Sequence, residues 1–304
     1  AHLMESTWLS LELYFEHRNY IASAFLFFPI SIILINLCGR LKIKLANFLI
    51  GLIFAVLCFL TYQRAGLWAD SNKLETYWAV ATPESARAQN RLTVLLLNLG
   101  MRKEAIEHSE LQDDKFKNSS LLTINRLLIK VYLGVAVKGD FDMAADRLAS
   151  QPFDAQSVKG LRSLVETIEK NQRAQGFSEY AELTLDVLHA YDNNLAYKNN
   201  SMFKRFSPYL KAKLYLVSHQ YSLAYEGFFQ AMGEYNETDA ALSMVAELSN
   251  AGRFTEALLL LNEAENIYEQ QPKRTLKRSV SVYDYEFKRM RNMLELAIDS
   301  LVER

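Results

Sequence analysis

The residues best suited to chemistry lie within the first twenty positions of the chain. Glu5, Glu12 and Glu16 are spaced by seven and four residues, which places three carboxylates on one face of a helix. Beside that face come three further polar side chains, His17, Arg18 and Tyr20. An arginine at a membrane boundary suits a lipid phosphate, because its planar fork makes paired hydrogen bonds to phosphate oxygens. Residues 1–19 are therefore expected to form an interfacial segment on the outer face of a membrane.

The same residues are also typical of a plain interfacial helix. In that alternative the charged side chains reach up to water, and Trp8 and Tyr20 belong to the aromatic belt of the membrane boundary. The physical pattern alone favours this anchoring role over a phosphate site, and both interpretations stay open.

Two long uncharged runs follow this segment. Residues 20–38 and 45–62 contain no formal charge, and at about 1.5 Å per residue each nearly covers a hydrocarbon core of ~30 Å. The pattern predicts a two-span transmembrane hairpin over residues 20–62, and the alternative is a buried hairpin of a soluble protein. The connecting loop 39–44 carries Arg40, Lys42 and Lys44 without an acid, which favours a cytoplasmic position. Residues 63–304 are then expected outside the cytoplasm, in the periplasm if the chain spans a bacterial inner membrane.

Composition excludes several classes of protein. Thirty-four Lys and Arg residues are balanced by 35 Asp and Glu residues, so the chain lacks the basic excess that nucleic-acid binding demands. Eleven Gly and five Pro residues are few for an all-β chain, which uses both in its many turns. No metal-ligand spacing, phosphate-binding Gly loop or GxSxG motif occurs, so we expect no metal and no cofactor.

A short pattern, Gly followed by Ala five positions later, recurs in the second part of the chain. It occurs at Gly100–Ala105, Gly139–Ala144, Gly176–Ala181 and Gly252–Ala257, with the variant His219–Ala224. Gly is suited to the left-handed turn that ends one helix, and Ala lets the next helix pack closely on the first. The spacing of 33 to 43 residues between these starts resembles tetratricopeptide repeats, which are helix-turn-helix units. The resemblance implies a helical solenoid over 63–304, and an irregular all-helical domain is the alternative.

Three further features belong to this repeat region. Residues 191–207 are rich in Asn and Ser and are expected to form an insertion between repeats. The basic run 273–278 is expected to be a solvated linker, and an apolar series from Tyr283 to Leu301 predicts a capping helix. The many aromatic residues between 180 and 235 are expected to be core more often than ligand groove.

The amino-terminal string HLMEST, followed by LELYFEHRNY, resembles the last outer loop of multi-spanning membrane proteins with C-terminal tetratricopeptide repeats. This family includes the transmembrane and tetratricopeptide-repeat O-mannosyltransferases, which look like glycosyltransferases of the C-type membrane fold. The resemblance implies that Glu16, His17, Arg18 and Tyr20 lie near the phosphate of a polyprenyl-phosphate sugar. The family's catalytic acid belongs to a first outer loop that is absent from this sequence. The chain alone is therefore expected to be inactive, and no catalytic residue is assigned.

Two functions follow from these patterns. In the first, the chain is the C-terminal portion of a membrane glycosyltransferase-like protein, whose repeats bind acceptor or partner protein. In the second, it is a non-enzymatic membrane scaffold for an envelope assembly or secretion complex. Both predict a protein or peptide partner on the repeat surface, since repeat arrays offer binding surfaces and no chemistry of their own.

Overall fold

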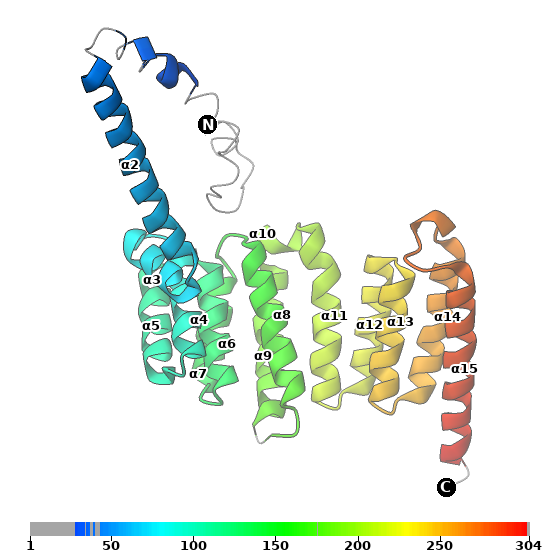
Figure 1. The fold of residues 1–304 in the computed structure, drawn as a ribbon. Helices are drawn as coiled ribbons and strands as arrows, with labels where there is room; N and C mark the ends of the chain where they lie inside the picture. The colour runs from blue at the N-terminus through cyan, green and yellow to red at the C-terminus, as the bar shows by residue number, and fades with distance from the viewer. Residues whose placement is uncertain (1–27, 34, 37–38, 40–42, 175, 303–304) are drawn as a thin grey trace. The chain divides into compact units, whose positions relative to one another are not determined.

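A computed structural model gives the fold of the chain and describes residues 28–33, 35–36, 39, 43–174 and 176–302 (Figure 1). The chain divides into two compact units, Ala1–Leu74 and Glu75–Arg304, which we call unit 1 and unit 2. All regular structure in the described residues is helical, as the sequence predicts.

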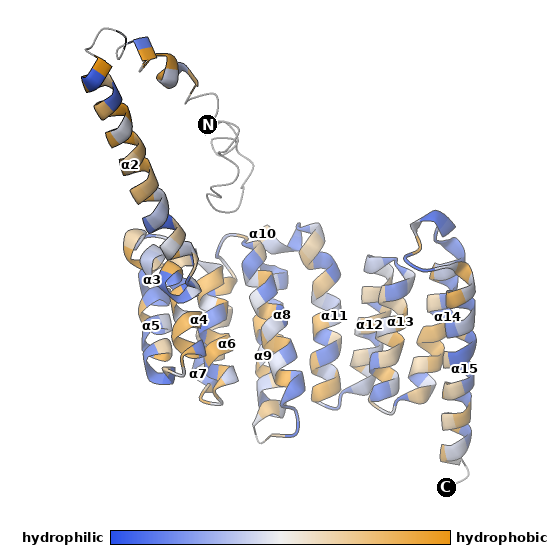
Figure 2. Cartoon of the chain, viewed as in Figure 1, coloured by the Kyte–Doolittle hydropathy of each residue, from blue (hydrophilic) through white to orange (hydrophobic). Residues whose placement is uncertain are grey.

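The main element of unit 1 is α2 (Ile43–Trp68), a 26-residue apolar helix. Among the described residues it alone is long and apolar enough to cross a membrane. Its hydrophobic surface is almost entirely exposed and Ala46 is its one buried residue, as expected of a helix that needs an apolar surrounding (Figure 2).

The limits of α2 differ from the predicted span 45–62. The helix begins at Ile43, inside the predicted loop 39–44, and continues to Trp68. The residues after the apolar run, QRAGLW, contain no proline and mostly favour helix, so loss of hydrophobicity there does not end the helix. Most of the predicted first span, 20–38, lies outside the described residues, and its described parts, 28–33 and 35–36, are helical.

Unit 2 consists of helices that follow one another in space in the order of the chain (Figure 1). Their bounds are α3 (Ser71–Ala81, which begins in unit 1), α4 (Ala86–Asn98), α5 (Arg102–Lys115), α6 (Ser120–Tyr132), α7 (Lys138–Leu148), α8 (Ala155–Lys170), α9 (Phe177–Asn193), α10 (Leu195–Lys198), α11 (Ser201–Val217), α12 (Tyr221–Tyr235), α13 (Thr238–Asn250), α14 (Phe254–Gln270), the 3₁₀ turn η2 (Lys273–Thr275) and α15 (Val280–Val302).

These helices pack as neighbouring pairs that also contact the next pair. The pairs α4/α5, α6/α7, α8/α9, α11/α12 and α13/α14 are each joined by a short connection, and α6 packs on α8, α7 on α9 and α8 on α11. Two hydrophobic clusters result, one over residues 124–217 and one over 212–294, and α11 contributes to both. Hydrophobic and hydrophilic residues alternate along most of these helices (Figure 2), as expected of helices with one buried and one solvated face.

Four of the first helices of a pair end in the same Schellman turn. In α4, Gly100 N–H bonds to the Leu97 carbonyl and Met101 N–H bonds to the Leu96 carbonyl, both at 3.0 Å. The equivalent left-handed residues of α4, α6, α11 and α13 are Gly100 (φ +78°), Gly134 (φ +69°), His219 (φ +58°) and Gly252 (φ +72°). The positive φ explains the preference for glycine at this position.

The prediction for Gly139 was wrong in detail. Gly139 lies inside the first turn of α7, and the left-handed residue of this pair is Gly134, five positions earlier. The connection is longer here because α7 starts only at Lys138, where the carboxylate of Asp140 accepts a hydrogen bond from Val137 N–H at 3.0 Å. Gly176 also differs, since it is left-handed but serves as the N-cap of α9.

The predicted alanines all lie in helix interfaces. Five residues have no exposed surface: Ala105, Ala144, Ala181, Ala224 and Ala257. Each sits in the first turns of the second helix of a pair, where a larger side chain would hold the two backbones apart.

Segment 191–207 is mainly helical rather than an irregular insertion. Its asparagines interrupt the helices only briefly, because Asn194 caps α10 and Asn200 caps α11 through side-chain oxygens that accept backbone N–H groups. Tyr191, Tyr197 and Phe203 from this segment are completely or almost completely buried against one another. The turn-forming composition therefore marks helix starts here, while the aromatic residues fix the segment in the core.

Candidate functional site

The site residues expected from the sequence, Glu16, His17, Arg18 and Tyr20, lie outside the described residues. Their proposed role at a lipid phosphate stays a prediction. The site that the described residues do contain lies elsewhere, on unit 2.

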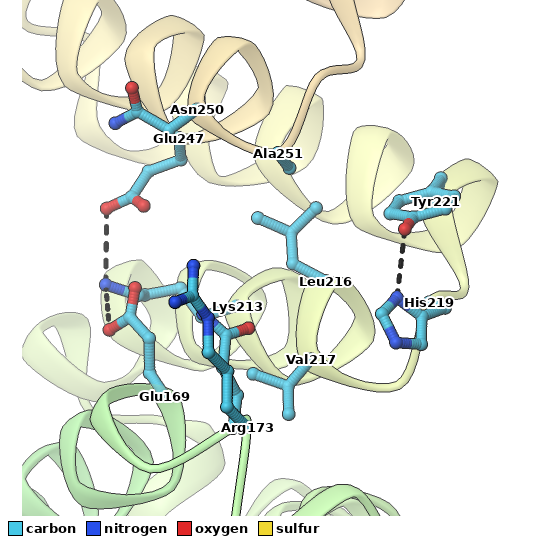
Figure 3. Close-up of a pocket in the computed structure, with 11 residues that line it drawn as sticks. Glu169, Arg173, Lys213, Leu216, Val217, His219, Tyr221, Glu247, Asn250 and Ala251 are labelled. Carbon is cyan, nitrogen blue, oxygen red and sulfur yellow. Dashed lines mark hydrogen bonds and ion pairs between the residues drawn. The ribbon is translucent and has the colours of Figure 1, made fainter.

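This site is a cleft of about 580 Å³ at the carboxyl ends of α8, α11 and α13 (Figure 3). The three helices meet here because α8 packs on α11, and because α11 and α13 both contribute side chains to the second hydrophobic cluster. The residues that line the cleft are Glu169, Gln172, Arg173, Lys213, Leu216, Val217, His219, Tyr221, Glu247, Asn250 and Ala251.

Lys213 joins the three helices through two ion pairs, which we call the Lys213 bridge. Its Nζ lies 2.7 Å from Glu169 Oε2 on α8 and 3.2 Å from Glu247 Oε1 on α13 (Figure 3). The Lys213 side chain is only 10% exposed, whereas those of Glu169 and Glu247 are 31% and 22% exposed. Burial of Lys213 opposes its charge, but the hydrogen bond to Glu169 and the nearby carboxylates outweigh burial, so the pKa of Lys213 is raised. The lysine thus stays charged at any physiological pH.

Tyr209 contacts both Lys213 and Glu247 of the bridge. Its ring lies 5.6 Å from Lys213 Nζ, and its hydroxyl donates a 3.3 Å hydrogen bond to Glu247 Oε1. Burial, together with the negative charge of Glu247, raises the pKa of Tyr209 to about 12 against the opposing effect of Lys213. This hydroxyl therefore acts only as a donor to the carboxylate.

Other groups in the cleft are left open to a ligand. Arg173 and Asn250 line the cleft, are exposed and have no partner among the described residues (Figure 3). Leu216 and Val217 form an apolar wall. Such a mixture suits a peptide, which brings amide groups and side chains of several kinds.

One edge of the cleft is formed by the turn that ends α11, in which His219 is left-handed. His219 Nδ1 lies 2.9 Å from the Tyr221 hydroxyl, and the Arg253 guanidinium stacks 4.6 Å from the Tyr221 ring centre. These contacts fix Tyr221 as a wall of the cleft rather than as core.

The side chains that line the cleft are charged, amide, aromatic or apolar. Among its lining residues none is a Ser, Cys or Thr nucleophile beside a base. In the part of the chain that the structure describes, no group of three His, Cys, Asp or Glu side chains could hold a metal ion. What these residues can do is bind, through charge, amide hydrogen bonds and apolar contact.

The sequence reasoning missed Glu169, Lys213 and Glu247. A signal existed, since each is a charged residue near the carboxyl end of an otherwise apolar helix face, but their joint position depends on how three helices pack. The expectation that the aromatic residues are mainly core is confirmed for Tyr191, Tyr197, Phe203 and Phe228.

Comparison with known proteins adds no relative. No protein-family model matches the chain, and no curated protein matches it significantly.

Proposed function

We propose that the chain is a membrane-anchored helical-repeat protein whose unit 2 binds an extended segment of a partner or acceptor protein in the cleft. The anchoring part of this proposal is supported by α2, which is apolar along its length and almost wholly exposed. The binding part is carried by one observation: the cleft beside the Lys213 bridge is lined by Arg173 and Asn250, which have no partner among the described residues.

The tetratricopeptide-like character of unit 2 is part of the proposal. It is supported by three repeated features, namely helix pairs that contact the next pair, Schellman turns after the first helix, and a fully buried alanine early in the second. In such arrays each unit packs mainly on its neighbours, and the ends of successive helices form a continuous surface for a ligand.

The chemistry of the expected ligand follows from the groups in the cleft that have no partner among the described residues. The carboxamide of Asn250 can both donate to and accept from a peptide backbone, and Arg173 can bind an acidic side chain through paired hydrogen bonds. Leu216 and Val217 offer an apolar surface in the same cleft. We therefore expect a segment in which an acidic residue lies next to an apolar one.

A peptide array tests this function. The purified full chain in detergent micelles is applied to arrayed short peptides, and the dissociation constants of the bound sequences are measured by fluorescence anisotropy. We expect Arg173→Ala and Asn250→Ala each to weaken binding about tenfold, a loss of about 1.4 kcal/mol. Lys159→Ala removes an exposed cation of α8 away from the cleft and should change nothing. Equal binding by all four proteins would exclude the cleft as the site.

The wider setting is proposed from the amino-terminal resemblance. On this hypothesis the chain is the C-terminal part of a glycosyltransferase-like protein that uses a polyprenyl-phosphate sugar, with unit 2 in the periplasm of a bacterium. In the complete protein, Arg18→Ala should then abolish most sugar transfer, and Arg18→Lys should restore little, because lysine lacks the paired geometry on phosphate. Full transfer by Arg18→Ala would favour the scaffold alternative.

The orientation is tested separately. A cysteine placed in loop 39–44 should react only from the cytoplasmic side, and one placed in unit 2 only from the other side. Cytoplasmic labelling of unit 2 would exclude both the periplasmic location and the sugar-transfer setting, while the cleft could still bind peptide.

A further inference from the structure

A group of aromatic rings continues from the Lys213 bridge along α11. The Tyr209 ring, which lies 5.6 Å from Lys213 Nζ, is 6.5 Å from the ring of Tyr235 at the carboxyl end of α12. The Tyr235 ring also lies 6.2 Å from the ring of Phe206. Because Phe206 precedes Lys213 by seven residues on α11, these rings extend about two helical turns, or ~10 Å, from the bridge.

Two arginines lie beside Tyr235, one on α8 and one on α11. Burial raises the pKa of Tyr235, and the positive charges of Arg162 and Arg205 oppose that rise, which places both guanidinium groups near the Tyr235 side chain. On α8, Arg162 precedes Glu169 of the bridge by seven residues, so it too lies about two turns from the bridge. We call Arg162, Arg205 and Tyr235 the Arg205 patch.

The Arg205 patch has donors that the described residues do not use. Arg205 is exposed and makes no hydrogen bond or ion pair within the part of the chain that the structure describes, and the Tyr235 hydroxyl has no hydrogen-bond partner there either. The Arg162 side chain is 56% exposed and donates only its Nε, to Glu166 at 2.7 Å. The terminal nitrogen atoms of both arginines are therefore open to a ligand.

The charge of the patch is positive. Glu166 is bonded to it, but only through Arg162. Glu237, the next carboxylate whose charge reaches the patch, is ion-paired with Lys277 at 3.2 Å. Arg205 thus has no carboxylate to balance it among the described residues, and this charge favours an anionic group on a ligand.

We propose that the Arg205 patch binds a second acidic side chain of the same peptide segment that occupies the cleft. This inference rests on the function proposed above. The second carboxylate accepts paired hydrogen bonds from the Arg205 guanidinium and a further one from the Tyr235 hydroxyl. Continuity with the cleft identifies the occupant, because the rings of Phe206 and Tyr209 connect the patch to the Lys213 bridge.

The distance between the two places sets the spacing in the ligand. An extended chain advances about 3.3 Å per residue, so it covers the ~10 Å between the patch and the bridge in about three residues. Arg173 follows Glu169 of the bridge in the chain, which adds to this length. The ligand class is therefore a peptide with two acidic residues about three to five positions apart, one of them next to an apolar residue.

Labelled peptides test this inference by fluorescence anisotropy with the full chain in detergent micelles. All the peptides are short and carry one Glu-Leu pair in a Ser-Gly background. Half have a second Glu about four positions from the first, placed before or after the pair, and the other half have Gln there. For the unchanged chain we expect the second Glu to strengthen binding about tenfold over Gln in one of the two placements, because arginine binds a carboxylate more strongly than an amide.

Variants of α11 and α12 assign the effect to the patch. Arg205→Ala should abolish the preference for Glu over Gln and leave binding of the Gln peptide unchanged. Lys204→Ala is the matched control, because Lys204 is an exposed cation on the same helix, about 100° around it from Arg205, and this variant should keep the preference. Tyr235→Phe removes only the hydroxyl and should reduce the preference about threefold. Circular dichroism checks that each variant is folded.

The outcomes separate this inference from the function on which it rests. Equal binding of the Glu and Gln peptides by the unchanged chain, or a preference that persists in Arg205→Ala, overturns the inference. The cleft then still stands if Arg173→Ala weakens binding of the Gln peptide. Gln-peptide binding that Arg173→Ala leaves unchanged overturns the cleft and with it the shared segment, and absence of binding by every peptide overturns both.

Discussion

α6 and α11 occupy equivalent positions in their helix pairs, and both carry cations that join neighbouring helices. On α6, Arg126 and Lys130 belong to a cluster that we call the Asp113 network, with Arg147, Glu110, Asp113, Asp114 and Asp140. On α11, Lys213 makes the bridge described above. Both clusters join helices through ion pairs, and the Asp113 network contains more of them.

The Asp113 network is closed. Asp113 is completely buried and accepts hydrogen bonds or ion pairs from Thr123 at 2.7 Å, Arg147 at 2.7 Å and Arg126 at 3.3 Å. The Lys213 bridge has no fully buried carboxylate, since the side chains of Glu169 and Glu247 are 31% and 22% exposed, and it borders open space. The buried carboxylate of Asp113 is used up in holding helices together, whereas the unpaired Arg173 and Asn250 beside the Lys213 bridge are left for a ligand. This difference is why we assign binding to the cleft.

The largest effect is expected from a substitution that breaks the Asp113 network. Asp113→Ala leaves Arg126 and Arg147 without their shared buried carboxylate, so we expect a loss of about 3–5 kcal/mol in unfolding free energy. The measurement is guanidinium unfolding of the full chain in micelles, followed by circular dichroism at 222 nm. Asp114→Ala, whose side chain is 62% exposed, should cost less than about 1 kcal/mol. Equal losses would contradict the difference in burial.

A smaller effect is expected in the open cluster. Lys213→Met leaves Glu169 and Glu247 facing each other, but water reaches both carboxylates, so we expect a loss of about 1–2 kcal/mol. The same unfolding measurement applies. Glu247→Gln added to Lys213→Met should recover part of the loss, because one negative charge is removed. A loss as large as that of Asp113→Ala would mean that the bridge is a structural element of the same kind.

The turns that end α6 and α11 provide the third comparison. Gly134 and His219 both have positive φ, but only glycine adopts this conformation without steric cost. We expect Gly134→Ala to destabilise by about 1–2 kcal/mol and His219→Gly to stabilise by about 0.5–1 kcal/mol. Thermal unfolding of the two variants measures both. Destabilisation by His219→Gly would show that the contact with Tyr221 outweighs the strain.

The smallest effect concerns pH. Burial lowers the pKa of His108 on α5, where Thr93 Oγ1 lies 2.8 Å from Nδ1. The unfolded chain then binds a proton more readily, so stability is unchanged above a pH of about 6.5 and falls below it, towards the lower folded pKa. We expect a loss of less than about 1 kcal/mol between pH 6.5 and 5.5. His108→Gln should show a flatter profile, and an identical slope would exclude His108 as its source.

Much of the local structure could be predicted because it depends on neighbouring residues. The all-helical fold, the apolar helix after residue 43, the buried alanines and the final helix follow from composition and periodicity. The predictions were wrong where one residue type can serve two structural roles. Asn194 and Asn200 cap helices instead of forming a loop, and Gly139 lies in a helix while Gly134 makes the turn.

By itself the sequence determined which stretches become helices and which face of each helix is apolar, because these properties repeat every three to four residues along one element. The position and the lining of the cleft were decided only by the tertiary structure. Glu169, Lys213 and Glu247 lie on three helices, and their charges meet because the packing of α8, α11 and α13 brings their carboxyl ends together. Contacts between distant residues depend on the rotation and spacing of whole helices, which no local pattern specifies.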